Sequence, residues 1–264
     1  MGLEYLSGEV PERQEGHFIM MDEMYKSIFM DKPWNIDYDC FNLEINVRKR
    51  ATEHNVRCIY DTKGDYKEAF ASIFHFFNEL VWFYDLRVSN VNGGHSEGSH
   101  VVLNYTVNSD QYLLGFKQRV CGELQHLSLA FFREAKCNES PFYRFLCFRK
   151  ILEIPRKGDK HFDKGKWIEA QLKELKSETA KRASTFLDTK IGDMSLADWL
   201  YKKGRHAIAH GDRNIVRDPN DYDDWDEIRW ANEIMQELAE TLIITLLGVP
   251  AVVGWVEPYP TQQN

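Results

Sequence analysis

The sequence predicts an α+β fold that is predominantly helical, with a small N-terminal α/β region followed by a helical bundle. Short alternating segments lie in the first part of the chain, whereas apolar residues at three- and four-residue steps dominate the second part. A chain of 264 residues with 43% hydrophobic residues can bury two modest cores. We therefore expect an N-terminal region over 1–108, a helical bundle over 109–250 and a C-terminal tail over 251–264.

Three segments of the N-terminal region have the pattern of strands. Residues 39–46 alternate between polar and apolar side chains, and residues 55–60 and 100–107 also have extended character. The glycine-rich segment 90–99 matches neither a phosphate-binding loop nor a dinucleotide fingerprint. We expect this segment to be a surface loop.

One helix is predicted inside the N-terminal region. Asp65 is its expected cap, Glu68 completes a capping box, and the pattern ends at about Tyr84. Apolar side chains surround most of this helix, so we expect it to be buried between the two domains or under a dimer partner.

Five helices are predicted in the second region. They cover about 110–136, 141–155, 167–186, a segment that begins after Ser195, and 223–247. Ser140, followed by Pro141, and Ser195, followed by Asp198, are expected N-caps. The last helix is expected to begin at Asp223 or Asp224 and to end at Gly248.

A short basic segment near the end of the bundle carries groups that suit phosphodiester chemistry. Arg205, His206 and His210 place a permanent cation and two imidazoles within six residues. A guanidinium binds phosphate oxygens through a planar set of donors, and an imidazole exchanges protons near neutral pH.

The charge of the whole chain is unfavourable for RNA binding, because the net charge is −8. Contact with RNA therefore needs a local patch, and positions 202–217 supply one with a net charge of +4. Besides Arg205, its expected substrate-binding residues are Lys202, Lys203, Arg213 and Arg217.

Arg205-His206-x-x-x-His210 resembles the Arg-polar-x3-His signature of HEPN domains, small helical bundles of which many are metal-independent endoribonucleases. The resemblance covers roughly the second half of the chain. The C-terminal helical segment is also similar to that of proteins from methylamine-utilisation clusters.

The HEPN resemblance implies an endoribonuclease that needs no metal or cofactor and acts as a homodimer in a toxin or antiviral defence setting. Arg205 and His210 would carry out the reaction and His206 would assist. Two copies of the motif would form one composite site, and the products would be a 2′,3′-cyclic phosphate and a 5′-hydroxyl.

Other interpretations of the motif remain open. His206 and His210 have a zinc-ligand spacing, although Ala207 stands where a zinc protease has glutamate. Arg205 could instead pair with a carboxylate of the bundle, and His210 could stabilise a helix C-terminus. The main alternative function is a non-catalytic module that binds a nucleotide or a regulatory protein, with an N-terminal domain that senses a ligand.

The composition favours a cytoplasmic protein outside the membrane. Its five cysteines are odd in number and never form a C-x2-C pair, which is typical of reduced thiols. The most apolar stretch, 242–256, is shorter than the ~20 residues that a membrane span needs. The N-terminus lacks a secretion signal pattern.

Overall fold

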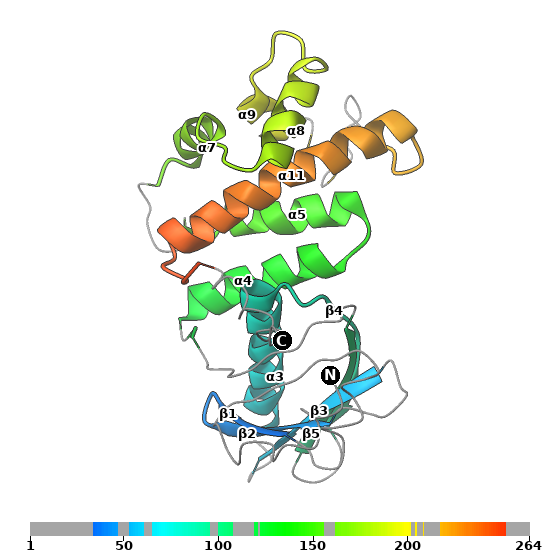
Figure 1. The fold of residues 1–264 in the computed structure, drawn as a ribbon, viewed down its shortest axis with the longest axis vertical. Helices are drawn as coiled ribbons and strands as arrows, with labels where there is room; N and C mark the ends of the chain where they lie inside the picture. Colours follow the sequence, from blue (N-terminus) through cyan, green and yellow to red (C-terminus); the bar gives the residue numbers. More distant parts are fainter. Residues whose placement is uncertain are drawn as a thin grey trace, which may run out of the picture. The chain divides into compact units, whose positions relative to one another are not determined.

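The computed structural model of the chain describes residues 34–46, 53–60, 65–95, 100–107, 119–120, 122–155, 162–201, 204, 208 and 217–251. The chain divides into two compact units, which we describe separately. Unit 1 consists of Met1–Arg119 and Val252–Asn264, and unit 2 of Val120–Ala251. The predicted α+β class is confirmed, because unit 1 contains an antiparallel sheet with one helix and unit 2 is helical within its described residues (Figure 1).

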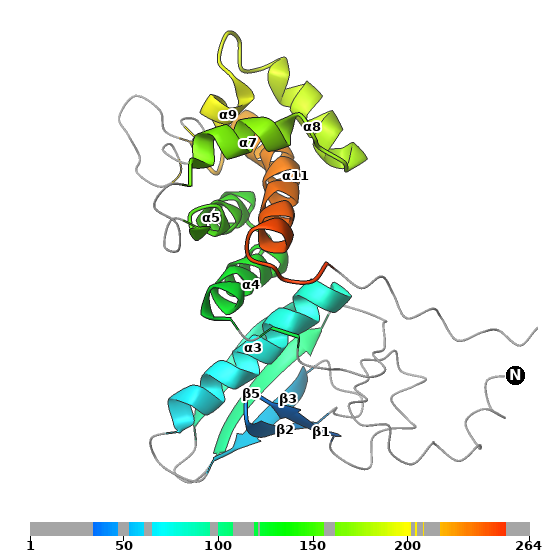
Figure 2. The ribbon, with the colours of Figure 1, turned by 90° about the vertical axis from the view of Figure 1, so that its left-hand side faces the viewer.

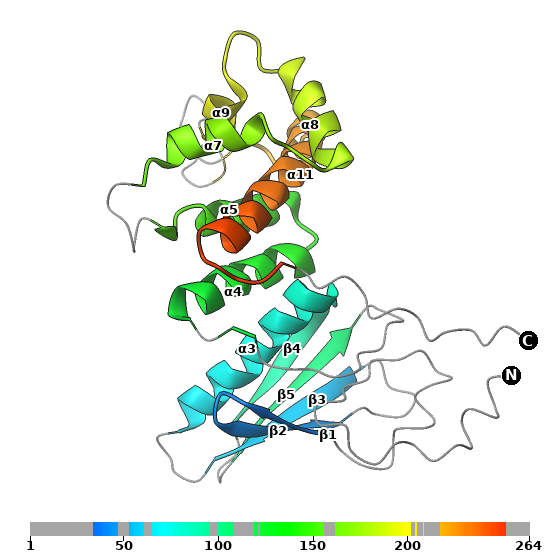
Figure 3. The same cartoon turned by 60° about the vertical axis from the view of Figure 1, so that its left-hand side comes forward.

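Unit 1 is built on a five-stranded sheet with the strand order β1-β2-β3-β5-β4 (Figure 3). Its strands are β1 (Trp34–Tyr38), β2 (Phe41–Asn46), β3 (Glu53–Ile59), β4 (Val88–His95) and β5 (His100–Val107). All neighbouring strands are antiparallel. The predictions of strands in β2, β3 and β5 are confirmed, whereas β1 was not predicted.

The strand predicted over 39–46 begins at Phe41, two residues later than expected. Asp39 and Cys40 instead form the turn between β1 and β2. Their φ angles are 47° and 66°, and two consecutive residues with positive φ are the signature of a type I′ hairpin turn. Such turns usually contain asparagine, aspartate or glycine, so Cys40 is an unusual occupant.

The predicted surface loop 90–99 is wrong for residues 90–95, which belong to β4; residues 96–99 lie outside the described part. Gly93 has a φ of 133°, and a Cβ atom there would collide with the carbonyl oxygen of Val102 on β5. The glycine thus permits close backbone approach in an edge strand whose register shifts between Ser89 and Asn92.

Helix α3 (Tyr66–Tyr84) covers one face of this sheet (Figure 2). The rings of Phe76 and Phe77 contact Tyr38 and Tyr105 of the strands, with centroids 6.0 and 4.9 Å apart. The sheet of its own unit therefore covers one side of this apolar helix.

Asp65 is the N-cap residue of α3, but its side chain makes no cap hydrogen bond. Its backbone is already helical, with φ −80° and ψ −7°, whereas a side-chain cap requires an extended backbone. The predicted capping box with Glu68 is therefore wrong.

Unit 1 also buries a carboxylate. Glu79 on α3 is completely buried and accepts hydrogen bonds from the Tyr38 hydroxyl at 2.7 Å and the Arg119 backbone N–H at 3.0 Å. These hydrogen bonds connect β1 and Arg119 to α3.

The described residues of unit 2 form a helical bundle. Its helices are α4 (Glu123–Cys137), α5 (Pro141–Ile151), α7 (Lys164–Leu172), α8 (Glu178–Asp188), α9 (Leu196–Trp199) and α11 (Tyr222–Thr245). Helix α5 packs between α4 and α11, α8 packs on α11, and α9 contacts α7 and α8 (Figure 1). The predicted caps Ser140 and Ser195 are confirmed, with side chains that accept from the backbone N–H of Tyr143 and Asp198.

The first predicted bundle helix is shorter than expected. Within the described residues it begins only at Glu123, because Gly122 has an extended backbone and serves as its N-cap. The side chain of Gln125 accepts from the Gly122 N–H and donates to the carbonyl of Leu247. Residues 110–118 lie outside the described part.

The helix predicted over 167–186 is in fact two helices, α7 and α8. The break has a long-range cause: the Lys176 and Ser177 N–H groups donate to the carboxylate of Glu237 on α11. The Ser177 hydroxyl then caps α8.

The last helix begins earlier than predicted. Its N-cap is Asp221, whose carboxylate accepts from the Asp224 N–H at 2.9 Å, rather than Asp223 or Asp224. Gly248, with a φ of 67°, follows its end as expected. No helix within the described ranges is both long and apolar enough to cross a membrane.

Candidate functional site

The basic motif follows α9 in unit 2. The predicted catalytic residues Arg205, His206 and His210 lie outside the described residues. The same holds for three predicted substrate-binding residues, Lys202, Lys203 and Arg213. The structure does describe Tyr201 before these residues, Gly204 and Ile208 between them, and Arg217 after them.

The helix changes its geometry as it enters the motif. After the short α9, Leu200, Tyr201 and Gly204 have π-helical geometry, and Ile208 is α-helical. A π-helical turn widens the helix and changes the angular spacing of side chains, and such turns are frequent at functional sites. The spacing of an ideal α-helix therefore does not hold at Leu200, Tyr201 and Gly204.

Gly204, within the basic segment, packs against α5. It is buried, and a Cβ atom at this position would collide with the ring of Phe145 on α5. Phe145 is itself completely buried. Any larger residue at position 204 would have to displace either its own backbone or the ring of Phe145.

Arg217 lies at the far end of the basic segment and is held by carboxylates. Its guanidinium forms ion pairs with Asp224 and, at 2.7 Å, with Glu227, and its side chain is only 9% exposed. It also lies over Trp199, with 5.4 Å between Cζ and the ring centroid. Contact with an RNA phosphate would require these bonds to open.

The acidic run that follows the motif thus has structural partners. Asp221 caps α11, Asp224 and Glu227 bind Arg217, and Asp226 pairs with Arg229 at 2.8 Å. These contacts support a structural role for the run.

Tyr201, immediately before Lys202, lies beside two cations that the sequence did not single out as site residues. Its ring centroid is 5.4 Å from Arg149 Cζ and 5.9 Å from Lys164 Nζ. Lys164 is also 3.9 Å from the carboxylate of Glu153. Arg149 occupies the position of a core-facing helix residue, so its place near the motif could be found only from the packing of α5.

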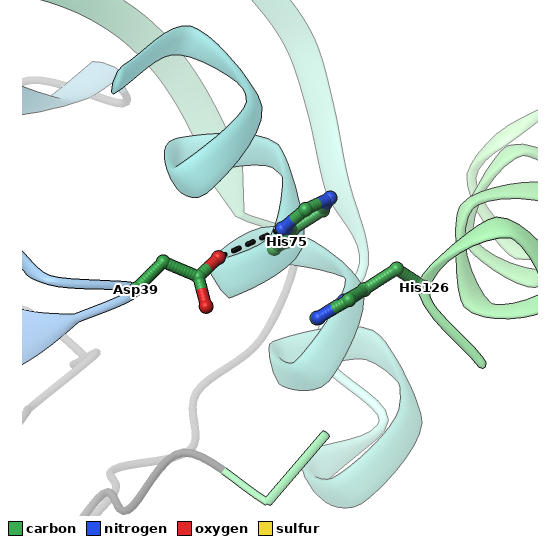
Figure 4. A group of neighbouring side chains, drawn as sticks. All are labelled: Asp39, His75 and His126. Atoms are coloured by element: carbon green, nitrogen blue, oxygen red, sulfur yellow. Dashed lines mark hydrogen bonds and ion pairs between the residues drawn. The ribbon is translucent and has the colours of Figure 1, made fainter. Parts of the chain in front are cut away.

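Unit 1 contains a separate polar pair, shown in Figure 4. The Asp39 carboxylate and the His75 Nδ1 atom are 2.8 Å apart, and both side chains are about a third exposed or less. The bond ties the β1–β2 turn to α3. His126, also drawn in Figure 4, belongs to unit 2, where it is buried on α4.

The sheet of unit 1 carries a row of asparagines on the face opposite α3. The paired positions run across β2, β3, β5 and β4, and the four residues are Asn46, Asn55, Asn104 and Asn92. The Asn104 amide donates to the Asn92 side-chain oxygen at 3.1 Å. Their regular alignment was not predicted, because it depends on strand register.

Comparison with known proteins identifies a similarity in unit 2. Residues 128–244 match the family model of the methylamine utilization protein MauJ. The MauJ-like segment begins within α4 and ends within α11, so it includes the basic motif. The predicted resemblance to methylamine-utilisation proteins is supported for this segment, whereas the HEPN resemblance finds no support in the comparisons. Searches among curated proteins and among solved structures found no match.

Proposed function

We propose that this protein is a metal-independent endoribonuclease of HEPN type, which acts as a cytoplasmic homodimer in a toxin or antiviral defence setting. The observation that carries the proposal is the Arg205-His206-x-x-x-His210 motif within a helical bundle. The packing of Gly204 against α5 supports it, because a reactive segment must be held firmly by its scaffold.

The chemistry requires three groups. A base removes the proton of the ribose 2′-hydroxyl, the 2′-oxygen attacks the adjacent phosphorus, and an acid protonates the leaving 5′-oxygen. Arg205 would stabilise the charge of the phosphorane. His210 of each of two copies would supply the base and the acid, and His206 would orient the phosphate or its neighbouring histidine.

The proposed dimer explains how one histidine per chain suffices, because a two-fold axis brings two identical motifs to one linkage. Lys202, Lys203 and Arg213 would bind flanking phosphates. The products are a 2′,3′-cyclic phosphate and a 5′-hydroxyl, and no step uses a metal or a cofactor.

The test is incubation of purified protein with single-stranded RNA in the presence of a chelator. Wild type should cleave the RNA to cyclic phosphate ends, whereas Arg205→Ala and His210→Ala should lose cleavage. Arg182→Ala, an exposed arginine on α8, is the control and should cleave like wild type. No cleavage by wild type, or equal cleavage by all variants, would refute the proposal.

A second candidate function is a non-catalytic module that binds a nucleotide or a regulatory protein, with unit 1 as its sensor. The asparagine row of unit 1 favours this alternative, because it places a regular line of polar side chains across four strands. The MauJ description names a process and no reaction, so it is compatible with either candidate. Thermal stabilisation by a nucleotide, unchanged in Arg205→Ala and His210→Ala and without RNA cleavage, would support it.

A further inference from the structure

An aromatic ladder lies on the surface of unit 2, where α8 packs on α11. Its members are Trp225, Arg229 and Trp230 on α11, with Phe186 and Lys190 at the end of α8. The Arg229 Cζ atom lies 5.9 Å from the Trp225 ring centroid and 4.7 Å from that of Trp230. The rings of Trp230 and Phe186 are 5.4 Å apart, and Lys190 Nζ lies 5.8 Å from the Phe186 centroid. Alternating rings and cations thus connect the two helices.

The α11 side of the ladder is open to solvent. Trp225 is 37% exposed, and the Arg229 side chain is 45% exposed. Tyr222, one turn before Trp225, is 72% exposed, the highest value among the large hydrophobic residues that the structure describes. Contiguous aromatic surface marks a site of interaction, and Trp, Tyr and Arg contribute most of the binding energy in protein interfaces.

Arg229 is held in place before any partner binds. Its Nε and Nη2 atoms donate to the Asp226 carboxylate at 3.1 and 2.8 Å. A side chain that is already fixed loses little rotamer freedom on association. A guanidinium has five N–H donors, and those on Nη1 have no acceptor within the described residues. Arg229 can therefore bind a second carboxylate without breaking its bonds to Asp226.

The charges on this side of α11 are complementary to themselves. Asp226, Arg229 and Glu233 follow one another at steps of three and four residues, so acid, base and acid share one side of the helix. Glu233 has no ion pair within the described part of the chain. When two copies of such a surface meet across a two-fold axis, the base of each copy can lie opposite an acid of the other. A partner whose charges had a single sign would be attracted and repelled by the same surface.

We propose that the aromatic ladder is the surface through which two copies of this chain associate. The two α11 helices lie antiparallel, and Arg229 of each copy pairs with Glu233 of the other. Tyr222 and Trp225 supply the apolar area of the contact. The inference rests on the proposed function in one respect: that function requires two copies, and the ladder is where they meet.

The same turns of α11 also hold the end of the basic segment. Asp224 and Glu227, which bind Arg217, lie on the side of α11 opposite Trp225 and Arg229. The width of a helix is about 10 Å. In the proposed dimer, the basic segment of each copy therefore ends about one helix width from the contact.

Sedimentation equilibrium of the full chain provides the first test. Wild type should be a dimer. Trp225→Ala should raise the dissociation constant of the dimer by about tenfold or more, since loss of a central tryptophan commonly has an effect of this size. Tyr143→Ala, at a 42% exposed tyrosine on α5, is the matched control and should dimerise like wild type.

A charge exchange provides the second test. Arg229→Glu brings two carboxylates together across the axis, and Glu233→Arg brings two guanidinium groups together, so each variant alone should dimerise more weakly than wild type. An equal mixture of the two variants restores both opposite pairs and should form mixed dimers. This recovery also shows that both variants are folded. Lys181→Glu, which reverses an exposed cation on α8, is the control and should dimerise like wild type.

The outcomes separate the inference from the proposed function. A monomeric wild type, which would leave the ladder to another molecule, overturns the inference. A dimer that Trp225→Ala leaves intact, or a mixture of charge variants that stays monomeric, also overturns it, even if wild type cleaves RNA. A dimer that depends on Trp225 and forms from the mixed charge variants supports the inference. If that dimer does not cleave RNA, only the ribonuclease proposal fails.

Discussion

Replacement of Gly204 by alanine tests whether the motif is held against α5. Gly204 is itself helical, and in an open helix alanine is more stable than glycine by about 1 kcal/mol. Here the new methyl group would collide with the ring of Phe145. Because Phe145 is completely buried, its ring has little space into which it can move.

The magnitude follows from these two opposing effects. Overpacking of a core by one methyl group costs about 1–3 kcal/mol, which exceeds the gain in helix propensity. We therefore expect Gly204→Ala to lower the free energy of unfolding by up to about 2 kcal/mol. Phe145→Leu alone should lower it by a similar amount through the cavity that it leaves.

The assay is urea denaturation of wild type, of both single variants and of the double variant. The double variant should lose about 1 kcal/mol less than the sum of the single variants, because the smaller leucine side chain introduced by Phe145→Leu makes room for the methyl group. Cleavage of RNA should fall in Gly204→Ala and recover in part in the double variant. A more stable Gly204→Ala protein, or additive losses, would refute the close packing of Gly204 on Phe145.

Four further predictions concern stability and thiol chemistry. Asp221→Ala should lower the free energy of unfolding by about 1 kcal/mol in urea denaturation, and Asp223→Ala by clearly less, because only Asp221 caps α11; equal losses would contradict this assignment. Glu79→Ala should cost about 3 kcal/mol, because it leaves buried donors without their acceptor, whereas Glu79→Gln keeps an acceptor and should cost less. Burial raises the pKa of the Cys58 thiol from 9.0 to about 11. The folded state thus holds the thiol proton of Cys58 more tightly than the unfolded state does. The contribution of this thiol to stability is complete below about pH 9 and is lost as the pH rises towards 11. Denaturation at several pH values measures this loss, and the decline should be weaker in Cys58→Ala. At neutral pH a thiol reagent should modify the exposed Cys40 well before Cys58, and equal rates would contradict the burial.

Local patterns predicted much of the fold. The helices α3, α5 and α11 were found from their apolar periodicity, and the caps Ser140 and Ser195 from residue type and spacing. These features depend on interactions between residues close in sequence, so a single chain segment contains the information. The α+β class follows from the same local signals.

Two of the errors arose where distant residues decide the local structure. The break between α7 and α8 depends on Glu237, about 60 residues further along the chain, which binds two backbone N–H groups. Strand β4 contains glycines that indicate a turn by themselves, but Gly93 is required by the approach of Val102 from β5. No window of sequence around either position contains its partner.

The same distinction applies to the charges around the motif. Counted along the sequence, Arg217 belongs to the basic segment, but its contacts with Asp224 and Glu227 neutralise it inside the unit. Arg149 looks like a core residue of a helix, yet the fold brings its charge to Tyr201. Proximity to the motif in sequence is therefore a poor guide to which cations meet a substrate, because ion pairing and packing decide which charges remain available.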